Sequence, residues 1–199
     1  MKKLYFILSL LFSFSLYSQT YEGKITLDDG NIITGIVEMN YDTGINLVNS
    51  KNEIIEEIPA ENIKLAEINV DGEVQRYVYL ESYFSTFNFS KQTNLKFRMM
   101  QILSEGPKVT VLEYRPTVGL LTMTELTYLY LLKTGSQTPV MYSSIQRGSI
   151  IKPNYKRYEF KEFAMEFFAD CPALIEKIAS EEYDARESIE IAEMYNNCN

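Results

Sequence analysis

The sequence predicts an α+β fold, in which an antiparallel, β-rich body is covered by a C-terminal cap of three helices. Between residues 21 and 142, short segments alternate apolar and polar residues and are separated by turn residues. From residue 158 onward, apolar residues instead recur every third or fourth position, which is typical of amphipathic helices. Strands first and helices afterwards indicate an α+β fold whose two classes are segregated along the chain.

The first 18 residues have the features of an export signal. Lys2 and Lys3 form a positively charged N-terminal region, and Leu4–Leu16 is apolar but too short to span a membrane comfortably. Ser18 is a small residue at the expected cleavage position. We therefore expect a signal peptide over residues 1–18 and an extracytoplasmic mature protein, either periplasmic or secreted. No later stretch is long and apolar enough to predict a membrane span.

Residues 19–71 are expected to form a small β-barrel-like subdomain. Apolar segments follow one another closely there, and residues 28–31 (Asp-Asp-Gly-Asn) are typical of a hairpin turn. The second segment is apolar at odd and even positions alike, which predicts a more central strand. The expected strands are Tyr21–Leu27, Ile32–Met39, Ile45–Val48, Glu53–Ile58 and Ile63–Val70, with one helical turn at Pro59–Asn62.

These strands resemble the small SH3-like and Sm-like barrels. The resemblance is carried by Ile25-Thr-Leu-Asp-Asp-Gly30, Thr34-Gly-Ile-Val37 and Ile63-Lys-Leu-Ala-Glu-Ile68. It implies a small closed barrel for this part of the chain. Sm-like proteins bind RNA, but this chain differs from them in being acidic and in carrying an export signal, so no RNA binding is inferred.

Residues 72–151 are expected to form a second antiparallel sheet. Turn sequences at Ser104–Lys108 and Lys133–Ser136 predict two hairpins. The polar stretch Ser82–Asn94 is interleaved with phenylalanines and predicts either an irregular strand or a loop. The expected strands are Val74–Leu80, Phe97–Leu103, Val109–Arg115, Leu126–Leu132 and Val140–Tyr142.

Residues 152–199 are expected to form the helical cap. An apolar stripe recurs at helical spacing and predicts a helix that ends near Asp170, because Pro172 lacks the amide that a continuing helix needs. The stripe has two interpretations: it covers the sheet, or it forms a groove for lipid or a partner. Its members are Phe160, Phe163, Ala164, Phe167 and Phe168.

Two further helices are expected after Asp170. That residue can cap a second helix, in whose first turn Pro172 is tolerated. The sequence Asp184-Ala-Arg-Glu187 has the form of a capping box, with Asp in place of Ser or Thr, and predicts the start of a third helix. The apolar residues of these two helices are Leu174, Ile175 and Ile178, then Ile191, Met194 and Tyr195.

The two cysteines flank this helix pair. A short turn would make the helices antiparallel, which places Cys171 at the start of one beside Cys198 at the end of the other. We therefore expect a Cys171–Cys198 disulfide, worth on the order of 3 kcal/mol in the chain-entropy model. The alternative is two unpaired, buried thiols.

The composition excludes several chemistries. The chain contains no histidine, which removes Ser-His-Asp and Cys-His catalysis and histidine-ligated zinc. No glycine-rich phosphate loop precedes a helix, and we expect neither a cofactor nor a metal centre. The formal net charge of −8 disfavours binding to nucleic acid or to anionic lipid. Carboxylates are abundant, so two of them can lie by chance at the separation of the two catalytic carboxyl groups of a glycosidase.

One basic stretch differs from the acidic background and is the candidate ligand-binding segment. Cations beside tyrosines can hold an anionic or carbohydrate ligand through charge and stacking. The alternative is a solvated linker that leads into the first helix of the cap. The candidate residues are Lys152, Tyr155, Lys156, Arg157 and Tyr158.

Phe-Phe-Ala-Asp-Cys-Pro before an apolar helix, together with a closing Tyr-Asn-Asn-Cys, resembles a group of exported proteins from Bacteroidetes-type bacteria. This resemblance implies export but no particular activity. The first hypothesis is a non-catalytic envelope or secreted module that binds a protein or glycan partner. The alternatives are a carboxylate-only hydrolase of polysaccharide or peptidoglycan, and a purely structural envelope protein. The sequence does not indicate the oligomeric state.

Overall fold

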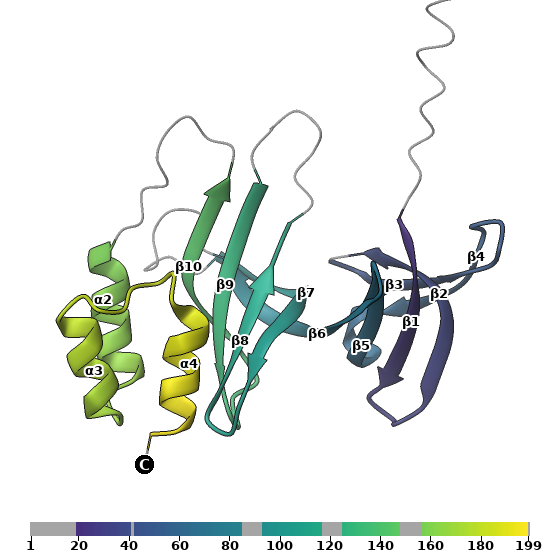
Figure 1. The fold of residues 1–199 in the computed structure, drawn as a ribbon. Helices are drawn as coiled ribbons and strands as arrows, with labels where there is room; N and C mark the ends of the chain where they lie inside the picture. The colour runs from purple at the N-terminus through teal and green to yellow at the C-terminus, as the bar shows by residue number, and fades with distance from the viewer. Residues whose placement is uncertain (1–18, 41, 85–92, 117–124, 148–156, 199) are drawn as a thin grey trace, which may run out of the picture.

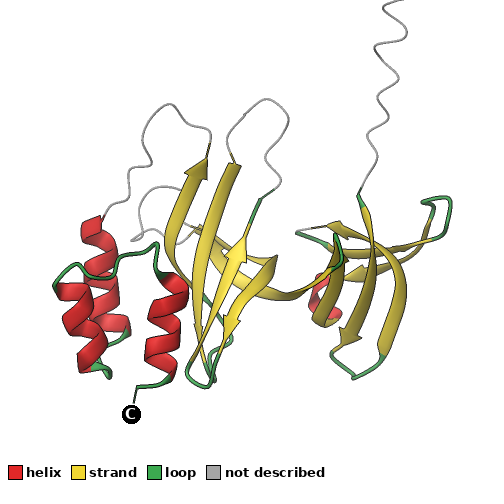
Figure 2. Ribbon diagram, in the orientation of Figure 1, coloured by secondary structure: helices red, strands yellow, loops and turns green. Residues whose placement is uncertain are grey.

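The structure, a computed structural model, describes residues 19–40, 42–84, 93–116, 125–147 and 157–198 of the chain. The expected signal peptide lies outside these residues. Within them, ten strands form one continuous sheet and three α-helices follow at the C-terminus (Figures 1 and 2). The arrangement confirms the predicted α+β fold with a C-terminal helical cap.

The strands pair antiparallel throughout, in the order β10-β9-β8-β7-β6-β5-β1-β2-β3-β4. A 3₁₀ turn, η1 (Ala60–Asn62), lies between β4 and β5, where one helical turn is predicted. The strands are β1 Thr20–Leu27, β2 Ile32–Asn40, β3 Gly44–Val48, β4 Ile54–Pro59, β5 Ile63–Val70, β6 Glu73–Phe84, β7 Thr93–Glu105, β8 Val109–Tyr114, β9 Glu125–Lys133 and β10 Val140–Arg147.

Strands β1–β5 enclose an apolar core of their own. Alternation in β1 turns Ile25 inward while Glu22 and Lys24 face solvent, as the period of two predicts. Rings from β6 complete this core, and the Tyr79 hydroxyl shares its one hydrogen between the Asn40 and Gly44 carbonyls, at 2.9 and 2.6 Å. Its fully buried side chains include Ile25, Val37, Ile45, Ala66 and Ile68.

Strand β2 is central in the strand order, as predicted, because it lies between β1 and β3. Val37 is fully buried, but Ile32 and Ile36 are 58% and 39% exposed. One-sided burial is common in antiparallel sheets, so apolar residues on both faces do not establish that both are covered.

The long strands β6 and β7 connect the two parts of the sheet. β6 pairs with β5 over Glu73–Tyr77 and with β7 over Tyr77–Phe84. Beyond this junction, β6–β10 bury apolar side chains on both faces. One face, which includes Val109, Val111 and Leu131, packs against the helices, and the opposite face carries Met100, Leu112, Tyr114, Tyr128 and Tyr130.

The helices α2 (Arg157–Phe167), α3 (Pro172–Ala179) and α4 (Ser188–Asn196) lie together beside the β8–β10 end of the sheet (Figure 1). Phe160, Ala164 and Phe168 are buried against this end, and the Tyr142 ring lies 6.0 Å from the Phe160 ring, centroid to centroid. The apolar stripe therefore covers the sheet, which was the first of its two interpretations.

Both predicted helix caps are wrong in detail. Since α3 begins at Pro172, Cys171 and not Asp170 is its N-cap residue, and the Asp170 carboxylate accepts a hydrogen bond from the Tyr195 hydroxyl at 2.9 Å. The α4 helix begins at Ser188 rather than directly after Asp184. The Asp184 amide does donate to Glu187 Oε2 at 2.8 Å, but the Asp184 carboxylate binds Arg186 instead of the Glu187 amide.

The predicted disulfide is confirmed. Cys171 and Cys198 are bonded, with their Cα atoms 5.9 Å apart and a sequence separation of 27 residues. The bond joins the start of α3 to the residues just after α4, and Cys171 is fully buried among the apolar side chains beneath the helices. The helical cap is thus cross-linked to itself as well as packed on the sheet.

Asn196 attaches α4 to the hairpin between β7 and β8. Its Oδ1 accepts hydrogen bonds from the Lys108 and Val109 amides at 2.9 and 2.8 Å, and its Nδ2 donates to the Val109 carbonyl at 3.0 Å. One side chain therefore satisfies three backbone groups of a hairpin that is distant in sequence.

Replacing Asn196 with alanine is expected to lower the free energy of unfolding by about 2 kcal/mol, because partly buried backbone groups lose their partners. Urea denaturation followed by circular dichroism measures this loss. Asn197→Ala is the matched control, since the Asn197 side chain donates to the Glu193 carbonyl one turn back in the same exposed helix end. Equal losses for the two variants would contradict the assigned role of Asn196.

Candidate functional site

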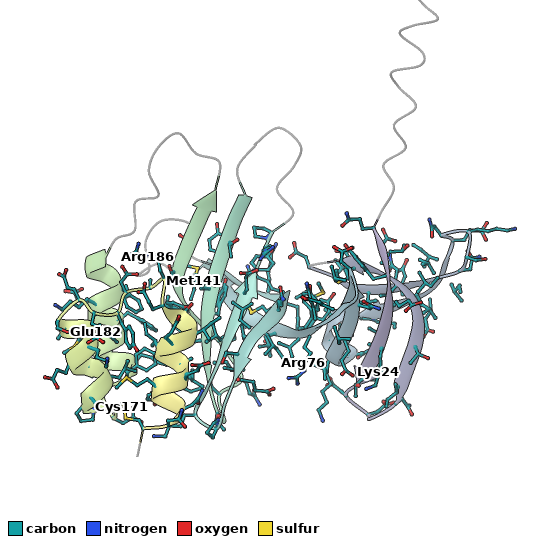
Figure 3. The ribbon with its side chains drawn as sticks, viewed as in Figure 1. Lys24, Arg76, Met141, Cys171, Glu182 and Arg186 are labelled. Atoms are coloured by element: carbon teal, nitrogen blue, oxygen red, sulfur yellow. A yellow bond between two sulfur atoms is a disulfide. The ribbon has the colours of Figure 1, made fainter. Side chains whose placement is uncertain are left out.

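A groove of about 770 Å³ lies between α2 and the connection from α3 to α4. We call it the helical groove. It lies on the helical cap, away from the strands β1–β5, at the end of the molecule that carries Glu182 and Arg186 (Figure 3). Its lining residues are Phe160, Lys161, Glu162 and Met165 from α2, Ile178 from α3, and Glu181, Tyr183 and Asp184 from the connection.

The base of the helical groove is apolar because Phe160, which packs on the sheet together with Ala164, also lines the groove. Met165 of α2 lines it as well and is 41% exposed. Ile178, only 2% exposed, closes the base from the side of α3.

Side-chain contacts hold the two walls of the helical groove in place. The Lys161 ammonium donates a hydrogen bond to the Ala179 carbonyl at 2.8 Å, which ties α2 to the end of α3. Lys177 pairs with Glu182 and lies 5.0 Å from the centroid of the Tyr183 ring, which fixes the start of the connection. The groove is therefore largely formed before any ligand arrives, as is usual for binding sites.

Glu181 holds an uncommon backbone conformation at the edge of the helical groove. The end of α3 has the hydrogen bonds of a Schellman motif, from the Glu182 amide to the Lys177 carbonyl at 2.9 Å and from the Glu181 amide to the Ile178 carbonyl at 3.2 Å. Glycine normally occupies the left-handed position of this motif, but here it is Glu181, with φ of 63°. A strained residue at a cavity edge is a reason to look for function there.

The rim of the helical groove is acidic. Glu162, Glu181 and Asp184 contribute carboxylates to it. The hydrogen bond from the Arg186 side chain is the largest of the effects that lower the pKa of Asp184 to about 2, so this carboxyl group is ionised at neutral pH. A general acid needs a raised pKa, so Asp184 is poorly suited to protonate a leaving group.

The candidate ligand-binding segment falls mostly outside the described residues, which is the case for Lys152, Tyr155 and Lys156. Arg157 and Tyr158 are the first two residues of α2, but their side chains are not among those described. The structure thus places the end of this segment on the helix that supplies Phe160 to the helical groove.

Sequence reasoning missed the helical groove because it is formed by side chains of two separate segments, and no motif marks Glu181 or Tyr183 as a functional residue. Within the described parts of the chain, no group of three or more His, Cys, Asp or Glu side chains is arranged to hold a metal ion. No described helix has the length and apolar character required to cross a membrane.

Comparisons with known proteins give no relatives. No protein-family model matches the chain, and neither the curated proteins nor the solved structures contain a match.

The disulfide is the structural feature that bears on cellular location, because such bonds are typical of proteins outside the cytoplasm. The geometry of the helical groove therefore has to support the functional argument by itself.

Proposed function

We propose that the protein is an exported, non-catalytic module whose helical groove binds an apolar, basic segment of a partner protein. The observation that carries this proposal is a groove with an apolar base and an acidic rim on a cap that is cross-linked to itself. Export is supported by the signal-like residues 1–18 and by the disulfide between Cys171 and Cys198.

The apolar base favours a ligand that inserts one or two hydrophobic side chains. Phe160 and Ile178 form a buried floor, and Met165 offers a flexible thioether that adapts to different shapes. Binding sites of this size are usually lined by apolar groups, with a few polar groups that fix orientation. A partner segment with apolar anchors matches this arrangement.

The acidic rim favours basic groups beside those anchors. Three carboxylates, those of Glu162, Glu181 and Asp184, line the groove against one cation, Lys161, and although Asp184 is paired with Arg186 the whole chain has a formal net charge of −8. Complementary charge raises the association rate with a basic partner and disfavours acidic competitors, and these effects are larger than its contribution to affinity. A segment that carries Lys or Arg next to its apolar anchors is therefore preferred over an acidic one.

A carboxylate-only hydrolase is less well supported by this geometry. Such an enzyme needs one carboxyl group that stays protonated near neutral pH. Asp184 has the opposite property, because the hydrogen bond from Arg186 lowers its pKa. The Asp170 pKa is lowered as well, chiefly by the hydrogen bond from Tyr195. These two carboxyl groups favour binding over acid catalysis.

Selection of a displayed library of random peptides on the disulfide-bonded protein tests the proposal. Enriched peptides are expected to combine apolar residues with Lys or Arg, and to bind less tightly as salt concentration rises. A Met165→Lys variant is expected to weaken the selected peptides by about tenfold or more, since it places a charge on the apolar surface and repels their basic groups.

Ile189→Lys is the matched control for Met165→Lys. Ile189 is also 41% exposed, but it lies on α4 and does not line the helical groove. The control is expected to bind the selected peptides as the unmodified protein does. Acidic peptides among those enriched, no enrichment at all, or equal weakening by the two variants would each overturn the proposal.

A further inference from the structure

A second, polar hollow of about 260 Å³ lies where β1, β2 and β5 meet β6–β8. We call it the strand pocket. It belongs to a different part of the molecule from the helical groove and shares no residue with it. Its lining residues are Tyr21, Met39, Val70, Gln75, Tyr77, Met99, Gln101, Glu113 and Arg115.

The strand pocket forms where one row of paired residues across neighbouring strands is polar, although the adjacent rows on the same face are apolar. Tyr77 pairs directly with Gln101, and Gln101 pairs directly with Glu113, so the three residues form a row across β6, β7 and β8. Side chains paired in this way share a face and lie within reach of one another. On the same face, Val111 and Val109 of β8 are fully buried beneath the helices.

The polar groups of the strand pocket offer both donors and acceptors. The Tyr77 hydroxyl donates to Gln75 Oε1, so this bond uses the oxygen of the Gln75 amide and not its two N–H donors. Gln101 forms no side-chain hydrogen bond within the described parts of the chain, and its amide can donate two hydrogen bonds and accept two. A half-buried amide of this kind on a rigid strand is suited to a hydroxylated ligand.

The charges of the strand pocket are already matched. Arg115 Nε donates to Glu113 Oε1, so the guanidinium and the carboxylate form an ion pair at the pocket wall. The Glu113 side chain is 10% exposed and the Arg115 side chain is 64% exposed. An anion would meet the Glu113 carboxylate and a cation would meet Arg115, so the wall favours a neutral ligand that hydrogen-bonds to both.

The remaining wall of the strand pocket is apolar and aromatic. Tyr21, Met39 and Val70 come from β1, β2 and β5, and Met99 comes from β7. A ligand that fits must therefore show C–H groups on one side and hydroxyl groups on the other. The pyranose ring of a sugar has this character, and aromatic rings commonly cover its C–H face.

We propose that the strand pocket binds one neutral sugar residue, with the Gln75 and Gln101 amides on its hydroxyl groups and Tyr21 with the methionines on its C–H face. Its volume is just below the ~300–1,000 Å³ that is usual for drug-sized ligands, so it holds a single ring. The ring is a free monosaccharide or the end of a glycan chain, and these two sources share the same chemistry.

Saturation-transfer NMR with the disulfide-bonded protein tests this inference. The probes are glucose, galactose, mannose and N-acetylglucosamine, with glucuronate and glucosamine as charged comparators. At least one neutral sugar is expected to bind more tightly than both charged comparators and, in ¹H–¹⁵N correlation spectra of the protein, to shift the backbone amide signals of Tyr77 and Gln101. A glycan that ends in the same sugar and binds more tightly would identify the chain end as the source.

Gln101→Leu removes the amide but keeps the size of the side chain, and is expected to weaken sugar binding by about tenfold or more. Gln137→Leu is the matched control, because Gln137 is exposed in the turn between β9 and β10. If Gln101→Leu changes the thermal unfolding midpoint, Gln75→Leu takes its place.

The result that overturns the inference is clear-cut. Any of three outcomes would overturn it: none of the four neutral sugars binds, the charged comparators bind equally well, or Gln101→Leu and Gln137→Leu have the same effect. Met165→Lys is expected to leave sugar binding unchanged, because Met165 lines the helical groove and not the strand pocket. Failure of peptide binding and failure of sugar binding are therefore separate outcomes.

Discussion

The paired variant Cys171→Ala/Cys198→Ala is expected to unfold with a free energy about 3 kcal/mol lower than that of the disulfide-bonded protein. The bond closes a loop of 27 residues that contains α3, the α3–α4 connection and α4. Without it, the unfolded chain gains conformational freedom in this loop, and the buried position of Cys171 loses a well-packed sulfur atom. Urea denaturation followed by circular dichroism measures the difference.

Reduction of the unmodified protein provides the control for this prediction. A thiol reductant is expected to lower the urea midpoint of the unmodified protein and to leave that of the paired variant unchanged. The α3–α4 connection lines the helical groove, so peptide affinity should fall together with stability. A loss in unfolding free energy below about 1 kcal/mol would contradict the role assigned to the cross-link.

The disulfide shows which long-range features a sequence can predict. Two short amphipathic segments joined by a short connection pack antiparallel, and this local argument alone brings Cys171 close to Cys198. The strands of the sheet were predicted for the same reason, since alternation in a segment such as Tyr21–Leu27 reflects its own burial. Features that depend on one segment and its neighbour were therefore within reach.

Features that depend on contacts between distant segments could not be predicted from the sequence. Strand β6 runs to Phe84, whereas its apolar pattern ends at Leu80, because Ser82 is fully buried and accepts a hydrogen bond from Arg98 at 2.8 Å. Nothing in the sequence near Ser82 indicates that partner. The expected cap at Asp170 was lost in the same way, to the hydroxyl of Tyr195.

Both candidate sites depend on packing or register that the pattern of a single segment does not reveal. The helical groove needs Met165 and Tyr183, which the α3 turn brings together, and the strand pocket needs the register that pairs Tyr77 with Gln101 and Glu113. Period and composition carry no information on register between strands. The candidate segment at Lys152–Tyr158 was chosen for its local charge instead, and its side chains lie outside the described ones.

Gly44→Ala is expected to lower the free energy of unfolding by about 3 kcal/mol or more, because strain and collision act together. Gly44 begins β3 with φ of +143°, a conformation that side chains rarely adopt. An added Cβ would lie 2.1 Å from the Ile58 carbonyl oxygen and 3.0 Å from the Ala60 nitrogen. Both are backbone atoms of the neighbouring strand and turn, so no side-chain rotation relieves the contact.

Gly72→Ala separates the two causes of that loss. Gly72 also has a positive φ, of +90°, but an added Cβ there meets no atom within 4 Å, so its substitution should cost about 1 kcal/mol. The difference between the two variants, measured by urea denaturation, gives the cost of the collision at Gly44. The Gly44 carbonyl also accepts the Tyr79 hydroxyl bond at 2.6 Å, so displacement of β3 would disturb β6 as well. Equal losses at the two glycines would mean that β3 and β4 separate easily, and that the core enclosed by β1–β5 is softer than its buried side chains indicate.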